Sequence, residues 1–242
     1  MQHDLEEIRA ARFAELPIRC DNAEPGIDEV DDWRDWTALE TTPDQKRIEE
    51  YLRHSKLSGR SVLHVGVGNS SLAERMAGRT GRIVGTTIAR NEATHGASLG
   101  IRNYDVEMHN KYSGRPLQHA ARFDFIVDNN PTTFCCCLHH LMTMMDFYEQ
   151  SLTQDGQILT DRAGLGWVVS TPGANQRWKF SFDDLAFVAG KVNLQAFAMD
   201  ENVIALARQA PPRIKKTGIV PFVRSVAHRA RRLLGRLRPA SS

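Results

Sequence analysis

The feature that most limits the fold is an alternation, from Ser61 onward, of short β-rich runs with longer stretches of helical periodicity. Such alternation is typical of a parallel sheet whose strands are joined by crossover helices. We expect strands over residues 61–65, 83–87, 102–106, 123–128 and 157–160. We expect helices over residues 71–78, 92–100, 133–152 and 183–189.

The end of this pattern differs, because residues 194–199 and 203–207 are two short apolar runs separated only by the polar turn 200–202. A tight turn of this kind indicates an antiparallel hairpin. The sequence therefore predicts an α/β fold, a doubly wound sheet that is mostly parallel, with an antiparallel hairpin at its C-terminal end and helices on both faces.

Charge divides the chain into three regions. Residues 1–41 form an acidic N-terminal arm with a predicted helix over 5–15, and residues 1–40 hold 12 Asp and Glu against four Arg. Residues 211–242 form a basic tail with nine Lys and Arg and no acid. The region between, 42–210, is nearly neutral and carries the alternating pattern. Its first helix is expected directly after Thr42, which can cap it in a capping box with Gln45.

Composition points to a protein of the cytoplasm. No apolar run reaches the roughly 18 residues that would span a bilayer, and the acidic N-terminus lacks the features of a secretory signal. The cysteines are Cys20 and the consecutive Cys135, Cys136 and Cys137, a spacing that suits neither a disulfide framework nor a paired metal site. We therefore expect reduced thiols and no metal. The neighbouring His139 and His140 point about 100° apart on a helix, which also disfavours a metal pair.

A glycine-rich turn is the main indication of chemistry. The apolar run 61–65 leads into the turn Gly66-Val67-Gly68-Asn69-Ser70, and a predicted helix follows. Glycines allow the turn to close and a ligand to approach the backbone, and the helix N-terminus offers free N–H groups. The turn predicts a nucleotide-like ligand, although a Gly-x-Gly can also simply tighten a connection between strand and helix.

Over roughly residues 42–208 the chain resembles the class I S-adenosylmethionine-dependent methyltransferases, which have a Rossmann-like fold. Their first strand ends in Gly-x-Gly-x-Gly, and the matching positions here are Gly66, Gly68 and Ser70. Their second strand usually ends in an acid that holds the ribose hydroxyls, and Thr87 stands there instead. Thr87 can form hydrogen bonds but lacks the charge of the carboxylate. The resemblance implies S-adenosylmethionine as the cofactor and a small-molecule substrate.

The resemblance also indicates further contacts to the cofactor. Asp105 and Asn110 both fall near the place where the family reads the adenine amino group, and the sequence does not decide between them. The main alternative for Asp105 is a solvated turn acid. His64 is included as a cofactor contact, although its place inside the first strand also suits a packed core histidine. Asn129, after the fourth strand, completes the predicted cofactor site.

Methyl transfer in the family takes place at the end of the fourth strand. Three residues near carboxyl ends of predicted strands are therefore candidates for catalysis: Asp128, Asn130 and Asp161. Asn130-Pro131 matches half of the Asn/Asp-Pro-Pro-aromatic motif of enzymes that methylate amino groups, but a helix start capped by Asn130 or Thr132 explains it as well.

The basic tail predicts an amphipathic cationic helix that binds an anionic membrane surface or a protein partner. Nucleic acid is disfavoured because no aromatic side chains are interleaved with the arginines. Location at the periphery of a membrane is thus an alternative to a purely cytoplasmic one, and the oligomeric state stays undetermined.

Two other functions compete with methyl transfer. The turn also overlaps the dinucleotide fingerprint, and Arg90 suits a 2′-phosphate, as in an NADP-dependent oxidoreductase; the sequence lacks an evident catalytic Tyr/Lys pair. The absence of an acid at Thr87 also fits a methyltransferase-like module that binds no cofactor and acts in assembly. An open, polar pocket at Gly66, Thr87 and Asn129 would favour an enzyme.

Overall fold

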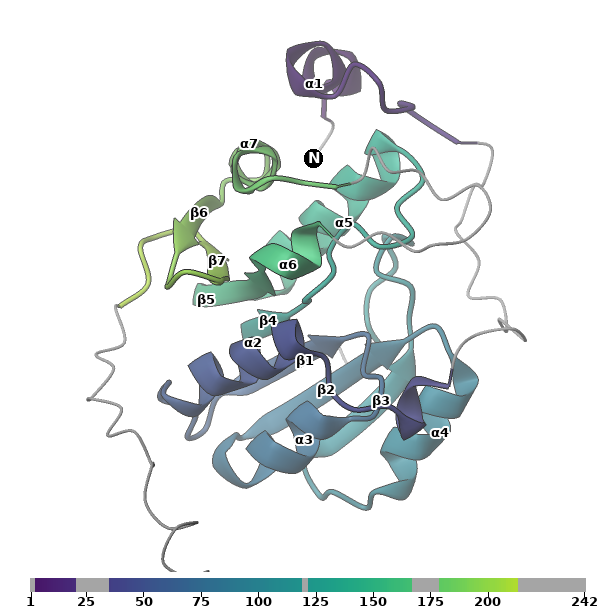
Figure 1. The fold of residues 1–242 in the computed structure, drawn as a ribbon, viewed down its shortest axis with the longest axis vertical. Coiled ribbons are helices and arrows are strands. Elements are labelled where there is room, and N and C mark those ends of the chain that lie inside the picture. Colours follow the sequence, from purple (N-terminus) through teal and green to yellow (C-terminus); the bar gives the residue numbers. More distant parts are fainter. Residues whose placement is uncertain (1–2, 21–34, 119–121, 167–178, 213–242) are drawn as a thin grey trace, which may run out of the picture.

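A single sheet forms the centre of the protein. The computed structural model describes residues 3–20, 35–118, 122–166 and 179–212, and within them the strand order is β3-β2-β1-β4-β5-β7-β6 (Figure 1). Strands β1 to β5 are parallel, and β7 runs antiparallel to both β5 and β6. The strands are β1 (Ser61–Val65), β2 (Arg82–Thr87), β3 (Tyr104–Met108), β4 (Phe123–Val127), β5 (Leu152–Asp161), β6 (Gln195–Ala198) and β7 (Val203–Ala207). The predicted fold class is confirmed, hairpin included.

Helices cover both faces of the sheet (Figure 1). Helices α2 (Pro43–Arg53) and α3 (Ser71–Met76) share one apolar cluster with the sheet, and α4 (Arg90–Ser98) packs on β2 and β3. Helices α1 (Leu5–Arg12), α5 (Leu138–Ser151) and α7 (Phe182–Gly190) share the cluster on the other face. The other short elements of the described residues are the one-turn helix α6 (Arg162–Leu165) and the 3-10 helices η1 (Trp36–Ala38) and η2 (Ala77–Arg79). Since both faces are covered, central strands such as β1 are apolar almost throughout.

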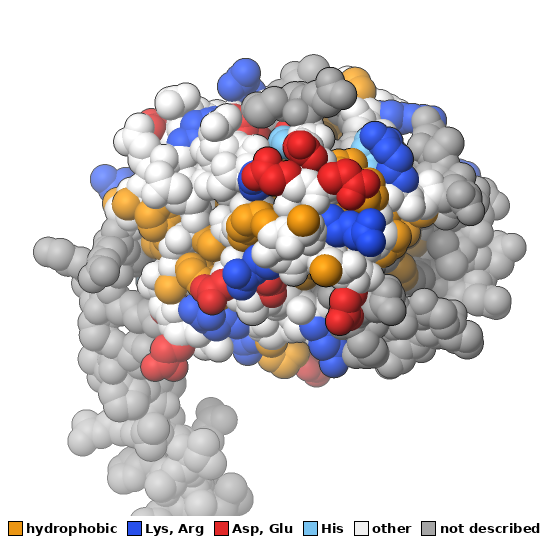
Figure 2. All heavy atoms as spheres, turned by 90° about the horizontal axis from the view of Figure 1, so that it is seen from above, with side chains coloured by type: hydrophobic (Ala, Val, Ile, Leu, Met, Phe, Trp, Pro, Cys, Tyr) orange, Lys and Arg blue, Asp and Glu red, His pale blue; other side chains and the backbone are white. Residues whose placement is uncertain are grey.

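Helix α1 of the acidic arm packs on the domain. Ile8 is buried in the core, and ion pairs of Arg12 with Asp184 and of Glu7 with Lys191 join the arm to α7 and the residue after it. Seen from the α1 end, charges of both signs are interspersed over the surface (Figure 2). In the described ranges every helix is too short or too polar to cross a bilayer. The predicted tail helix lies outside the described residues, which stop at residue 212.

Several predicted bounds differ from the structure: β3 begins two residues later than expected, α4 two residues earlier and β5 five residues earlier. Helix α5 begins at Leu138 and not at residue 133, because the preceding residues form turns in which Phe134 takes a left-handed conformation with φ of 64°. Helix α2 begins as expected after Thr42, but the Thr42 side chain caps no amide. Gln45 donates instead to Glu49 one turn further along, so no capping box forms.

Candidate functional site

A cavity of about 540 Å³ opens at the carboxyl edge of the sheet, where β1 lies between β2 and β4. Crossover connections leave in opposite directions at this point, so the loops after the two central strands diverge and leave a crevice. The volume lies in the range of about 300–1,000 Å³ that is usual for small-molecule sites. The cavity contains the three positions expected to mark an open site, Gly66, Thr87 and Asn129.

The glycine-rich turn forms one wall. Gly66 and Gly68 have φ of 73° and 50°, and a Cβ at Gly66 would meet nothing within 4 Å, so this backbone is open to a ligand. Asn69 also lines the cavity, but Ser70 does not. Ser70 keeps a left-handed φ of 59°, the conformation that a glycine would take there, and shares a hydrogen bond of 2.9 Å with the Tyr104 hydroxyl.

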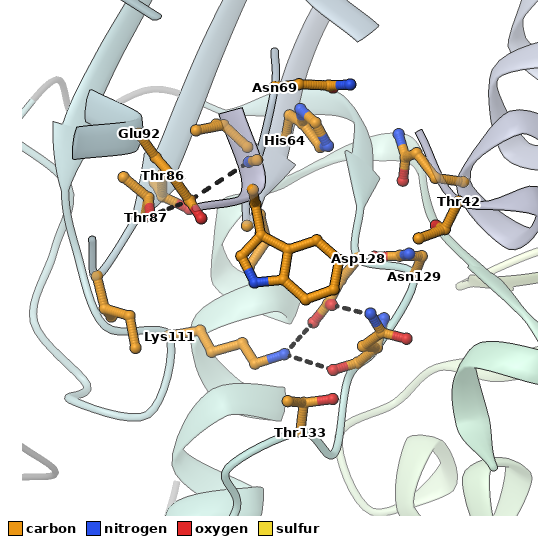
Figure 3. A pocket seen from close by; sticks show the side chains of 18 of the residues that line it. Thr42, His64, Asn69, Thr86, Thr87, Glu92, Lys111, Asp128, Asn129 and Thr133 are labelled. Carbon is orange, nitrogen blue, oxygen red and sulfur yellow. Dashed lines mark hydrogen bonds and ion pairs between the residues drawn. The ribbon is translucent and has the colours of Figure 1, made fainter. Parts of the chain in front are cut away.

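A carboxylate lies beside the end of β2, although the strand itself ends in Thr87. Glu92, in the first turn of α4, is buried in the cavity wall, and its Oε2 accepts hydrogen bonds from the Thr87 hydroxyl at 2.5 Å and from the Gly68 amide at 3.3 Å (Figure 3). The Thr87 hydroxyl in turn accepts from the Ala89 amide. Glu92 was not expected from the sequence. It lies five residues after Thr87, where an acid was expected, and the first turn of α4 brings it back to the end of β2.

A hydrogen-bond network around Asp128, the residue after β4, forms another wall of the cavity. Asp128 is 2% exposed, and its Oδ2 accepts from Lys111 Nζ at 2.8 Å and from the Tyr148 hydroxyl at 2.6 Å. Its Oδ1 accepts from the Asn130 amide at 3.1 Å. Lys111 also donates to the Asn130 carbonyl, and so ties the loop after β3 to the loop after β4 (Figure 3). Neither Lys111 nor Tyr148 was expected from the sequence.

The loop after β4 is fixed from behind by α6. Asn129 and Asn130 both line the cavity, and Asn129 Nδ2 donates to Asp44 in the first turn of α2 at 2.8 Å. Gly164 lies so close to this loop that a Cβ at that position would fall 1.6 Å from the Asn129 carbonyl oxygen. Asn130 Oδ1 is buried with no hydrogen-bond partner among the residues that the structure describes.

Two buried histidines, His64 and His109, also line the cavity. Burial lowers the pKa of His64 to about 4, against the smaller opposing effect of the Asp128 charge. Burial, with a smaller contribution from Arg115, lowers the pKa of His109 to about 4. Both imidazoles are therefore neutral at pH 7, which suits hydrogen bonding but not charge pairing.

Two predicted site residues lie elsewhere. Asp105 is at the amino end of β3, away from the cavity, and is a surface acid paired with Arg82 at 3.0 Å; Asn110, the alternative, lines the cavity. Asp161 ends β5 but is turned from the cavity. It is fully buried, accepts two hydrogen bonds from Arg47 and caps α6 through the Ala163 amide.

The end of the acidic arm covers the glycine-rich turn. Trp36, Leu39 and Thr41 line the cavity. Asn69 Nδ2 donates to the Leu39 carbonyl at 2.8 Å, which holds this segment across the turn.

No protein-family model matches the chain, and no curated protein matches it by sequence. Solved structures do. A sugar N-methyltransferase from Streptoalloteichus matches with a TM-score of 0.52 at 9% identity, over 68% of this chain and 86% of that chain. The CcbJ methyltransferase from Streptomyces caelestis matches with a TM-score of 0.52 at 12% identity, over 74% of this chain and 94% of that chain. The N-methyltransferase NodS from Bradyrhizobium japonicum matches with a TM-score of 0.51 at 14% identity, over 69% of this chain and 97% of that chain.

The protein thus has the Rossmann-like fold of the class I S-adenosylmethionine-dependent methyltransferases. The antiparallel β7 between β5 and β6 also separates it from the six-stranded order of the dinucleotide-binding fold.

Proposed function

We propose that the protein is an S-adenosylmethionine-dependent methyltransferase with a small-molecule acceptor. The observation that carries the proposal is the buried Glu92 carboxylate in the cavity wall, which accepts hydrogen bonds from the Thr87 hydroxyl and from the Gly68 amide of the open glycine-rich turn. The missing acid at the end of β2 was the main argument for a module without a cofactor. Glu92 supplies a carboxylate at the same edge of the sheet, and so removes that argument.

The residues of the cavity fit the parts of the cofactor. Gly66, Gly68 and Asn69, which line the cavity, would lie against its amino-acid portion, because the two glycines let a ligand approach the backbone. Glu92 would accept the ribose hydroxyls, because an ionised carboxylate forms stronger hydrogen bonds than a threonine hydroxyl. Asn110, which lines the cavity, would contact the adenine amino group, as the resemblance to the family implies. When bound, S-adenosylmethionine supplies the electrophilic methyl group.

The remaining task of the protein is to align the acceptor and exclude water. Asp128 was a candidate base, but Lys111, Tyr148 and the Asn130 amide already donate to it. We therefore assign Asp128 to positioning the loop that carries Asn129 and Asn130. These two asparagines are the proposed contacts to the acceptor.

Calorimetric titration of the purified full chain with S-adenosylmethionine, S-adenosylhomocysteine and NADPH tests the proposal. We expect binding of the two sulfur compounds and none of NADPH. Binding of NADPH alone would favour the oxidoreductase, and binding of none would favour the assembly module. If the cofactor binds, incubation with labelled S-adenosylmethionine and a library of small amines, alcohols and amino sugars identifies the acceptor.

A further inference from the structure

A second cluster of reactive side chains lies outside the cavity, at the N-terminus of α5. The Sγ atoms of Cys20, Cys136 and Cys137 and the Nδ1 atom of His140 all lie within 4.8 Å of one another. Cys137 and His140 are buried, whereas Cys20 and Cys136 are partly exposed. The cluster joins residues more than a hundred positions apart, so neither the spacing of the cysteines nor the His-His pair predicted it.

The backbone brings these four residues together. The Leu138 and His139 amides, at the open N-terminus of α5, donate to the Pro17 and Ile18 carbonyls at 2.9 Å each, which sets Cys20 beside the helix start. Cys137 is the N-cap in an extended conformation, so the two neighbouring cysteines do not follow the spacing of a helix. His140 follows in the first turn of α5.

The contacts within the cluster exceed what hydrogen bonding can explain. His140 Nδ1 lies 2.9 Å from Cys136 Sγ, 3.2 Å from Cys137 Sγ and 3.5 Å from Cys20 Sγ. A neutral imidazole has a single acceptor nitrogen with one lone pair, which cannot serve three thiols at once. A disulfide between Cys20 and Cys136, whose sulfurs are 3.1 Å apart, would leave Cys137 and His140 unexplained. One cation at the centre satisfies all four atoms.

We propose that Cys20, Cys136, Cys137 and His140 bind one zinc ion in a structural Cys₃His site. Three thiolates and one imidazole form a ligand set that zinc prefers, and four protein ligands close its tetrahedral shell. Zn–S bonds of about 2.3 Å and Zn–N bonds of about 2.0–2.1 Å place tetrahedral ligand atoms about 3.6–3.8 Å apart. The two closest pairs, Cys136 Sγ with His140 Nδ1 and Cys136 Sγ with Cys20 Sγ, would therefore separate by several tenths of an ångström when the ion enters.

The site has a consequence for the cavity. Only Cys135 separates the ligands Cys136 and Cys137 from Thr133 and Phe134, which line the cavity, and Cys20 lies in the segment after α1. Zinc would hold the N-terminal segment, the loop after β4 and the start of α5 at one point. It has no open position for substrate, so it stabilises the wall of the cavity and takes no part in the reaction.

Metal analysis and cobalt substitution of the full chain test the proposal. The protein is purified under reducing conditions, its zinc is measured by mass spectrometry, and the metal-free chain is titrated with Co²⁺. We expect one metal per chain, with thiolate-to-cobalt charge-transfer bands and the intense ligand-field bands of tetrahedral cobalt. A reduced chain that takes up no cobalt in this form overturns the proposal, and so does a wild-type chain that is isolated with a Cys20–Cys136 disulfide and binds no metal after reduction.

Variants assign the ligands. Cys20→Ser should weaken cobalt binding by about a hundredfold or more, since each of four ligands carries about a quarter of the binding free energy of a structural zinc. The charge-transfer bands should lose about a third of their intensity, because one of three thiolates is missing. The matched control is Cys135→Ser, because the Cys135 thiol donates to the Cys137 carbonyl and lies outside the cluster. Equal affinity and spectra for Cys20→Ser and the wild type would overturn the assignment, whatever the effect of either change on folding.

Discussion

The Thr87 hydroxyl donates a 2.5 Å hydrogen bond to the Glu92 carboxylate, so the end of β2 and the first turn of α4 act as one binding element. The carboxylate that the strand itself lacks comes from the next helix. Glu92 also accepts from the Gly68 amide, which ties this element to the glycine-rich turn.

Replacement of Glu92 by Gln should weaken S-adenosylmethionine binding by about 10- to 100-fold, because a hydrogen bond to a charged group contributes about 1.5–3 kcal/mol. Titration calorimetry measures the change. The matched control is Glu74→Gln, on an exposed position of α3, which should leave the affinity unchanged. An unaltered dissociation constant in a folded Glu92→Gln protein would refute the role of this carboxylate.

Replacement of Lys111 by Met should lower the free energy of unfolding by about 3–5 kcal/mol, because it leaves the buried Asp128 charge without its cation. The double variant with Asp128→Asn should lose less than the sum of the two single variants, since neither charge is then unpaired. Urea unfolding of the four proteins gives the coupling free energy. Strict additivity would show that the pair is not coupled.

Replacement of Asp161 by Asn should lower the free energy of unfolding by about 2–3 kcal/mol, since Asp161 receives two hydrogen bonds from Arg47. Its affinity for S-adenosylmethionine should stay within about twofold of the wild type, because Asp161 does not line the cavity. Loss of methyl transfer at full stability and affinity would instead restore Asp161 as a catalytic residue.

His64 should make the protein less stable in acid. Its pKa is about 4 when folded and 6.5 in the unfolded chain, so the unfolded state binds the extra proton between these values. The free energy of unfolding should be unaffected by His64 above pH 6.5 and fall by about 3 kcal/mol as the pH drops from 6.5 to 4.

Urea unfolding of the wild type and His64→Leu over this pH range measures that effect. The leucine variant should have the shallower pH profile, since leucine does not titrate, whereas His109 and the carboxylates contribute to both proteins. Parallel profiles would mean that His64 is not buried in its neutral form.

Each described strand of the sheet was expected from the sequence, although the bounds of β3 and β5 were not, because periodicity and turn residues are local signals. The sequence placed β1 at the observed bounds and identified the hairpin of β6 and β7. It placed the start of α5 too early, because nothing local signals the left-handed turn at Phe134. It could not define the network of Lys111, Asp128 and Tyr148, since these residues meet only when the chain has folded.

In the candidate site, too, the residues found from the sequence are those with a local signal, and those missed depend on folding. The glycine-rich turn and Asn129 were found because a strand leads directly into each of them. Asp105 and Asp161 were placed near the site from their positions along strands, but neither lines the cavity, and Asp161 is turned toward Arg47. The Cys20 cluster was missed because it needs the docking of the segment after α1 on α5.

The close approach of Gly164 to the Asn129 carbonyl has a consequence for how the cavity can change over evolution or in directed evolution. Any side chain at position 164 would clash with this carbonyl, so the loop after β4 or helix α6 would have to shift, which restricts the shape of that wall. The opposite wall, around Trp36 and Leu39, is set by side chains of a connecting segment. Variation that adapts the protein to a new acceptor should therefore accumulate in that segment, while position 164 stays glycine.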